Sequence, residues 1–92
     1  MSETRKLRIH GRVQGVWYRG WSVDTARGLG LRGWVRNRAD GTVEMLVRGE
    51  EEAVRRMIER CHEGPPAARV ERIDVEDSDE EAPAGFEGRA SL

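Results

Sequence analysis

Apolar and polar residues alternate along the first part of the chain. From Arg5 to Val13, apolar or small residues occupy every second position, and basic side chains occupy the positions between them. A period of two places the two sets on opposite faces of an extended backbone, which predicts a strand with one buried face. The predicted buried face carries Leu7, Ile9, Gly11 and Val13. Residues 1–4 precede this pattern and are predicted to form a flexible tail.

The apolar spacing changes to that of a helix in two places. Residues 18–29 carry an apolar or small side chain every three or four positions, which forms one stripe along a helix, and Gly30 follows as a left-handed C-cap. A second helix is predicted to open at Gly49, with three glutamates in its first turn, and to end at Gly64-Pro65-Pro66. The stripes consist of Tyr18, Ser22, Ala26 and Leu29 in the first helix and Val54, Met57, Ile58 and Cys61 in the second.

A hairpin is predicted between the two helices. Residues 31–37 and 42–48 form its strands, and the second strand alternates through Val43, Met45 and Val47. The intervening residues 38–41 include an Asp-Gly pair, which supplies the positive φ that a tight hairpin turn requires.

The last third of the chain predicts one longer strand and a weaker one. Residues 68–76 hold Val70, Ile73 and Val75, and the alternation breaks between Val70 and Ile73, which indicates either a turn or a bulge before a fourth strand. Residues 77–84 form an acidic loop, and residues 85–92 hold at most a short terminal strand, which Gly88 weakens.

The order of predicted elements is strand, helix, strand, strand, helix, strand. This order is typical of an α+β domain with the ferredoxin-like βαββαβ sandwich, in which an antiparallel sheet carries both helices on one face. A chain of 92 residues supports one domain, so residues 5–92 are predicted to form it, after the tail at 1–4.

Composition limits the classes of partner. Charged residues make up 36% of the chain, but the formal net charge is only −1, and a general nucleic-acid binder needs a basic surplus. RNA-recognition domains share this order of elements but stack bases on aromatic side chains of the central strands. The predicted strands at residues 7–13 and 42–48 contain no aromatic residue, so no nucleic acid is expected as a partner.

Several chemistries are disfavoured by the residues available. One cysteine and two histidines form neither a disulfide nor a metal site of ordinary spacing, so no metal is expected. No Ser or Cys is flanked by His in the manner of an activated nucleophile, and Cys61 falls on the apolar stripe. No secretory or membrane-spanning pattern is present, and we expect a cytoplasmic protein with no membrane partner.

The strand-to-helix turn is the strongest candidate for a site. The sequence GRVQGVWYR covers residues 11–19 and places Gly15 and Arg19 where a helix begins. Free backbone N–H groups and the positive end of the helix dipole favour anions there, and an arginine adds a planar fork suited to phosphate. The alternative to an anion site is a tight turn that only reverses the chain, with Arg19 facing the solvent.

Asn37 is the second candidate, because it ends the strand just before the hairpin turn. Its amide either caps the turn or orients a nucleophilic water, with its oxygen accepting from the water while its NH₂ group donates elsewhere. The residue pattern alone leaves both alternatives open.

The motif GRVQGVWYR, followed by ARGLGLRGWVRNRADGTVEMLVRG and the terminal GFEGR, resembles the acylphosphatase family over nearly the whole chain after Thr4. The resemblance implies hydrolysis of acyl phosphates, which are small molecules, to a carboxylate and inorganic phosphate, without metal or cofactor. It implies that Arg19 is the catalytic arginine and that Asn37 orients the water. The implied phosphate cradle consists of Gln14, Gly15, Val16, Trp17 and Tyr18, together with Arg19.

Two departures from the family pattern accompany this resemblance. Trp17 brings unusual bulk to the cradle and either alters substrate choice or simply packs, and Gly88 lies where the family usually has a β-branched residue nearby. Similar domains also occur within larger maturation proteins, so a non-catalytic phosphate-binding or regulatory module is the alternative function. Because the chain ends soon after the domain, a free-standing, monomeric enzyme is expected.

Overall fold

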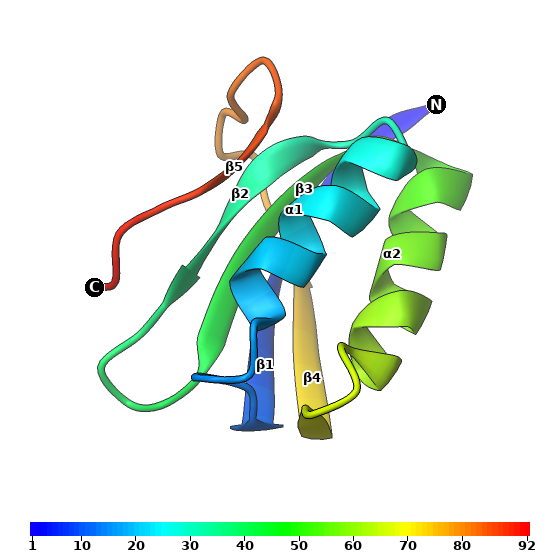
Figure 1. Cartoon of the computed structure of the whole chain (residues 1–92). Coiled ribbons are helices and arrows are strands. Elements are labelled where there is room, and N and C mark those ends of the chain that lie inside the picture. The colour runs from blue at the N-terminus through cyan, green and yellow to red at the C-terminus, as the bar shows by residue number, and fades with distance from the viewer.

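A five-stranded sheet with two helices on one face forms the fold in the computed structural model, which describes all 92 residues (Figure 1). The strand order across the sheet is β4-β1-β3-β2-β5. The elements in chain order are β1 (Ser2–Arg12), α1 (Tyr18–Gly28), β2 (Arg32–Asn37), β3 (Val43–Glu50), α2 (Glu51–Glu63), β4 (Arg69–Asp77) and β5 (Phe86–Gly88). The predicted ferredoxin-like sandwich is therefore confirmed. No helix has the length and apolar character needed to cross a lipid bilayer.

The sheet is mostly antiparallel, as predicted, and its last strand is the exception. Strands β1 to β4 pair antiparallel, whereas β5 runs parallel to β2, with Gly33 opposite Phe86. The chain reaches this edge through residues 78–85, and the guanidinium of Arg32 holds that loop by donating to the carbonyl oxygens of Ala82 and Pro83, both at 2.8 Å. A local pattern could not predict this direction, because it depends on which edge the loop reaches.

The start of β1, the end of β3 and the start of α2 also differ from the predictions. Strand β1 begins at Ser2 rather than Arg5, because Ser2 and Glu3 pair with Glu50 and Gly49 of β3. The same pairing keeps Gly49 in the strand, so α2 begins at Glu51 and not at Gly49. Of the two alternatives predicted between Val70 and Ile73, the structure has the bulge, and it lies within β4: the register of β1 with β4 shifts between His10 and Gly11, where Glu71 has no partner.

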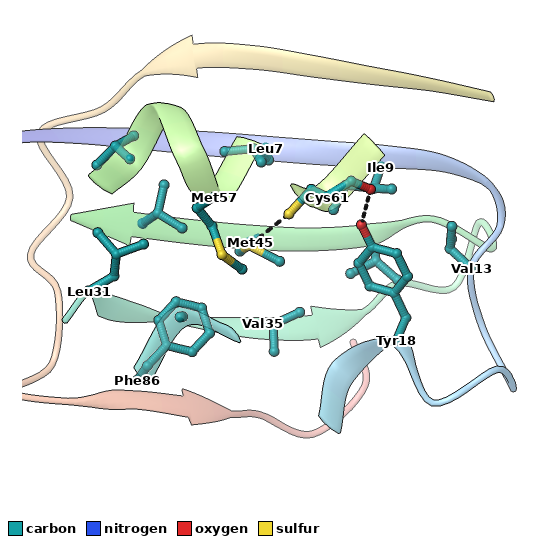
Figure 2. Close-up of a cluster of buried hydrophobic side chains, with 14 residues drawn as sticks. Leu7, Ile9, Val13, Tyr18, Leu31, Val35, Met45, Met57, Cys61 and Phe86 are labelled. Carbon is teal, nitrogen blue, oxygen red and sulfur yellow. Dashed lines mark hydrogen bonds between the residues drawn. The ribbon is translucent and has the colours of Figure 1, made fainter. Parts of the chain in front are cut away.

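The main core lies between the sheet and the helices (Figure 2). Alternate residues of β1 and β3 face it, and each helix contributes the stripe predicted from its spacing. The Tyr18 hydroxyl at the start of α1 donates to the carbonyl oxygen of Cys61 near the end of α2, at 2.6 Å. This bond fixes the first turn of α1, which carries the candidate site, to the second helix.

The opposite face of the sheet is also partly buried, which the alternation in β3 did not predict. Trp34 and Leu46 pack there against Ala82 of the 78–85 loop. Glu44 is buried beside them and accepts from Nε of Arg36 at 2.7 Å and Nη1 of Arg38 at 2.9 Å. Burial alone would raise the pKa of Glu44, but these two guanidinium groups lower it below its ordinary value. The ion pairs stabilise the hairpin that carries Asn37.

Candidate active site

The turn between β1 and α1 has an unusual backbone. Gly15 has a φ of 73° and Trp17 a φ of 67°, and Trp17 is the only residue other than glycine with a positive φ. A non-glycine residue in this region carries strain of roughly 1–3 kcal/mol, and such residues cluster at functional sites. Val16 lies between the two without a positive φ. Such alternation of backbone conformation is typical of the turns in which successive N–H groups form an anion-binding nest.

The N–H groups of this turn remain available to a ligand. None of the backbone N–H groups of residues 14–17 donates to another atom of the protein, and no side chain caps the start of α1. The first turn of α1 contains no acidic residue. The positive end of the helix dipole is therefore not neutralised by the protein, and it coincides with the nest.

Arg19 is the second residue of α1 and is partly buried. Its Nη1 atom donates to the carbonyl oxygen of Arg89 at 3.3 Å, and its guanidinium forms no ion pair with any carboxylate. Most arginines of this chain, by contrast, contact Asp or Glu. A guanidinium that the protein orients but does not neutralise retains its charge and its planar fork for an oxyanion.

Asn37 ends β2 and does not cap the turn that follows it. Asp40 makes the capping bonds, since its Oδ1 accepts from the N–H of Thr42 at 3.0 Å and from its hydroxyl at 2.6 Å. Both bonds lower the pKa of Asp40, and the bond from the Thr42 hydroxyl has the larger effect. The backbone carbonyl of Asn37 accepts from the N–H of Leu92 at 2.9 Å, and Asn37 lines the cleft that also contains Arg19.

This cleft has a volume of about 560 Å³ and is built from three separate parts of the chain. The β1–α1 turn and the first turns of α1 form one wall, Asn37 forms a second, and the segment after β5 forms the third. The lining residues are Val13, Gly15, Trp17, Tyr18, Arg19, Gly20, Val23, Asn37, Gly88, Arg89 and Ala90. The fold thus brings Arg19, Asn37 and Gly15 together.

Three of the predicted cradle residues point their side chains elsewhere. Gln14 donates from Nε2 to the carbonyl oxygens of Arg38 at 2.8 Å and Thr42 at 2.9 Å, so it ties the cradle turn to the hairpin turn. Val16 packs against the core, and the Tyr18 ring is buried. These side chains therefore do not supply the cradle, Gln14 and Val16 do not line the cleft, and the role of the backbone as a cradle stays a prediction.

The third wall of the cleft was not predicted from the sequence. Gly88, Arg89 and Ala90 line it, and in the sequence this segment contributed only the terminal GFEGR of the family resemblance. The GFEGR motif was the one sequence signal that could have indicated this wall. A local motif could not show, however, that the chain at the end of the last strand returns to the start of α1.

Cys61 is excluded as a nucleophile at this site. Its side chain is fully buried among the core residues, and burial raises the pKa of its thiol to about 12. The prediction that Cys61 packs in the core is therefore confirmed. No group of three or more His, Cys, Asp or Glu side chains is arranged to hold a metal ion.

Together, the fold and the cleft define a ferredoxin-like domain with a cationic cleft at a strand-to-helix turn. A family profile described as Acylphosphatase matches residues 5–88. A protein of Rhodospirillum rubrum named Acylphosphatase is 56% identical over 90 residues, which cover 98% of this chain and 99% of that protein.

Solved structures agree with this match. An acylphosphatase from Bacillus subtilis superposes with a TM-score of 0.90 at 36% identity, covering 97% of this chain and 99% of that one. An acylphosphatase from Coxiella burnetii superposes with a TM-score of 0.91 at 33% identity, covering 96% of this chain and 93% of that one. This chain belongs to the acylphosphatase family, whose members are hydrolases acting on acyl phosphates. The family and the enzyme class predicted from the sequence are confirmed.

Proposed function

We propose that this protein hydrolyses the carboxyl–phosphate bond of small acyl phosphates and releases a carboxylate and inorganic phosphate. The observation that carries the proposal is one cleft at the uncapped start of α1, which is lined both by Arg19, a residue without an acidic partner, and by Asn37. Family membership supports the same reaction.

In this mechanism the phosphoryl group is held by backbone and side-chain donors. The N–H groups from Gln14 to Tyr18 and the fork of Arg19 bind its oxygens and stabilise the charge of a loose, in-line transition state. These donors are already oriented in the folded protein, so little reorganisation is needed when charge develops on the oxygens.

Asn37 positions the attacking water on the side opposite the acyl group. The water oxygen forms the new bond to phosphorus, the bond from phosphorus to the acyl oxygen breaks, and the carboxylate leaves with the electron pair. The substrate's own phosphate oxygen takes the proton of the water. A carboxylate is a good leaving group, so this scheme requires no strong general base.

The experiment is the release of inorganic phosphate from benzoyl phosphate and acetyl phosphate in the presence of a chelator. We expect Arg19→Ala and Asn37→Ala each to lower turnover by about 10²–10³-fold, the usual loss for one transition-state donor. Arg60→Ala is the matched control, since Arg60 is exposed on α2 and lines no part of the cleft.

Two results would contradict the proposal. A folded wild-type protein that binds phosphate but releases none would instead be a non-catalytic phosphate-binding or regulatory module. Loss of binding without loss of turnover in Asn37→Ala would remove the water-positioning role while leaving the reaction itself in place.

We further propose that the protein acts as a monomer in the cytoplasm and needs no nucleic-acid partner. The core cluster is closed within one chain, and the single cysteine is buried and unpaired. Light scattering after gel filtration measures the mass directly, and a mass of twice 10.4 kDa would contradict the monomer.

A further inference from the structure

Trp17 differs from every other aromatic residue of the chain in its exposure. Its side chain is 63% exposed, whereas Tyr18, Trp34 and Phe86 are at most 2% exposed and Trp21 is partly buried. The other large exposed apolar residues are the two chain ends and Val75 of β4. The indole of Trp17 is therefore accessible to a ligand in the cleft that this residue lines.

The position of this indole is set by its neighbour on the helix. A side chain at Gly20 would overlap the indole nitrogen of Trp17, and its Cβ atom would lie 2.8 Å from both Cδ1 and Cε2 of the ring. The ring therefore lies directly against the backbone of Gly20. Both residues line the cleft, so the indole forms part of its wall instead of projecting freely from the turn.

The cleft has a polar set of lining groups and an apolar one. Gly15, Arg19 and Asn37 supply the polar groups used in the proposed reaction, whereas Trp17, Val23 and Ala90 supply apolar surface. The volume of about 560 Å³ falls in the range of about 300–1,000 Å³ typical of sites for drug-sized ligands, which a bare phosphate does not fill. The remaining space is where the acyl group of a substrate would lie.

We propose that Trp17 is a specificity-determining residue that packs against the acyl group, so that the enzyme prefers acyl phosphates with an aromatic acyl group over acetyl phosphate. This inference rests on the proposed function. An aromatic ring in contact with the indole gains from burial of apolar surface and from ring–ring packing, and acetyl offers little of either. Both substrates carry the same phosphate group, so its contribution to binding is equal and does not affect the preference between them.

The test compares kcat/KM for benzoyl phosphate with kcat/KM for acetyl phosphate. We use Trp17→Asn to remove the ring, because asparagine tolerates a positive φ better than most residues other than glycine. We expect the benzoyl-to-acetyl ratio to fall by about 3- to 10-fold, the size of an aromatic contact. Trp17→Phe should retain most of the ratio, and Gly20→Ala, which displaces the ring, should lower it like Trp17→Asn.

Val75→Ala is the matched control, because it removes an exposed apolar side chain from β4, far from the cleft lining. Its ratio should equal that of the wild type. If the wild type is active but Trp17→Asn and Gly20→Ala leave the benzoyl-to-acetyl ratio unchanged, the role of Trp17 is overturned and the proposed function stands. This holds even if the rates with both substrates fall equally. A folded wild type that hydrolyses neither substrate would overturn the proposed function and this inference with it.

Discussion

The guanidinium of Arg19 donates to the carbonyl oxygen of Arg89, 70 residues further along the chain, at 3.3 Å. The segment that provides this acceptor is itself attached to β2, because the N–H of Arg89 donates to Val35 at 2.8 Å and that of Leu92 to Asn37 at 2.9 Å. Residues 89–92 thus contact α1 and β2, the elements that carry Arg19 and Asn37, and Arg89 and Ala90 also line the cleft.

Removal of residues 89–92 should therefore damage activity more than stability. The core cluster contains none of these residues, and the loss of two backbone hydrogen bonds is expected to lower the free energy of unfolding by about 1–3 kcal/mol. A misplaced Arg19 or Asn37 should lower kcat/KM by up to about 10²-fold. Urea unfolding and phosphate-release assays measure the two effects, and a truncated protein with full activity would contradict the positioning role.

Arg19→Lys should recover little of the activity lost in Arg19→Ala. Lysine retains the positive charge but has no planar fork, so it cannot bind two phosphoryl oxygens and the Arg89 carbonyl in the same geometry. We expect kcat/KM to remain at least about 10-fold below wild type. Steady-state kinetics with benzoyl phosphate tests this, and near-full activity in Arg19→Lys would show that charge alone is sufficient.

Gln14→Glu should weaken the attachment of the cradle turn to the hairpin turn. The substitution removes both donors and places a carboxylate beside the carbonyl oxygens of Arg38 and Thr42, which we expect to lower stability by about 1–3 kcal/mol. The loss should shrink at low pH, where a protonated carboxyl group can donate one bond again. Urea unfolding of wild type and variant at pH 4 and pH 7 measures this difference. A pH-independent loss would assign the effect to packing.

Stability should fall in alkaline solution because of Tyr18 and Cys61. Burial raises the pKa of both groups, that of Cys61 from 9.0 to about 12, so the folded protein keeps protons that the unfolded chain releases. Below pH 9 neither group contributes to the pH dependence. Above it the free energy of unfolding should decrease by up to about 1.4 kcal/mol per pH unit for each titrating group, with Cys61 acting first and Tyr18 above pH 10.

Urea unfolding between pH 7 and pH 11 measures this slope. Tyr18→Phe removes the phenol and its bond to the Cys61 carbonyl, so it should be less stable at neutral pH by about 1–3 kcal/mol but show a shallower decline above pH 10. An identical slope in the wild type and Tyr18→Phe would mean that Tyr18 does not contribute to the alkaline loss.

The sequence by itself determined the elements and most of their boundaries. The alternation in β1, the apolar stripes of both helices and the breaks at Gly30 and Gly64 are all confirmed, because each depends on residues within a few positions of one another. The motif containing Arg19 also identified the family.

Only the tertiary structure decided how these parts combine. The parallel direction of β5, the wall formed by residues 88–90 and the burial of Glu44 each depend on segments that are distant in the chain. The two hydrogen bonds of Gln14 span 24 and 28 residues, and the contact of Arg19 spans 70. No local pattern encodes such pairs, because a side chain's partner across a sheet or cleft is set by how the whole chain packs.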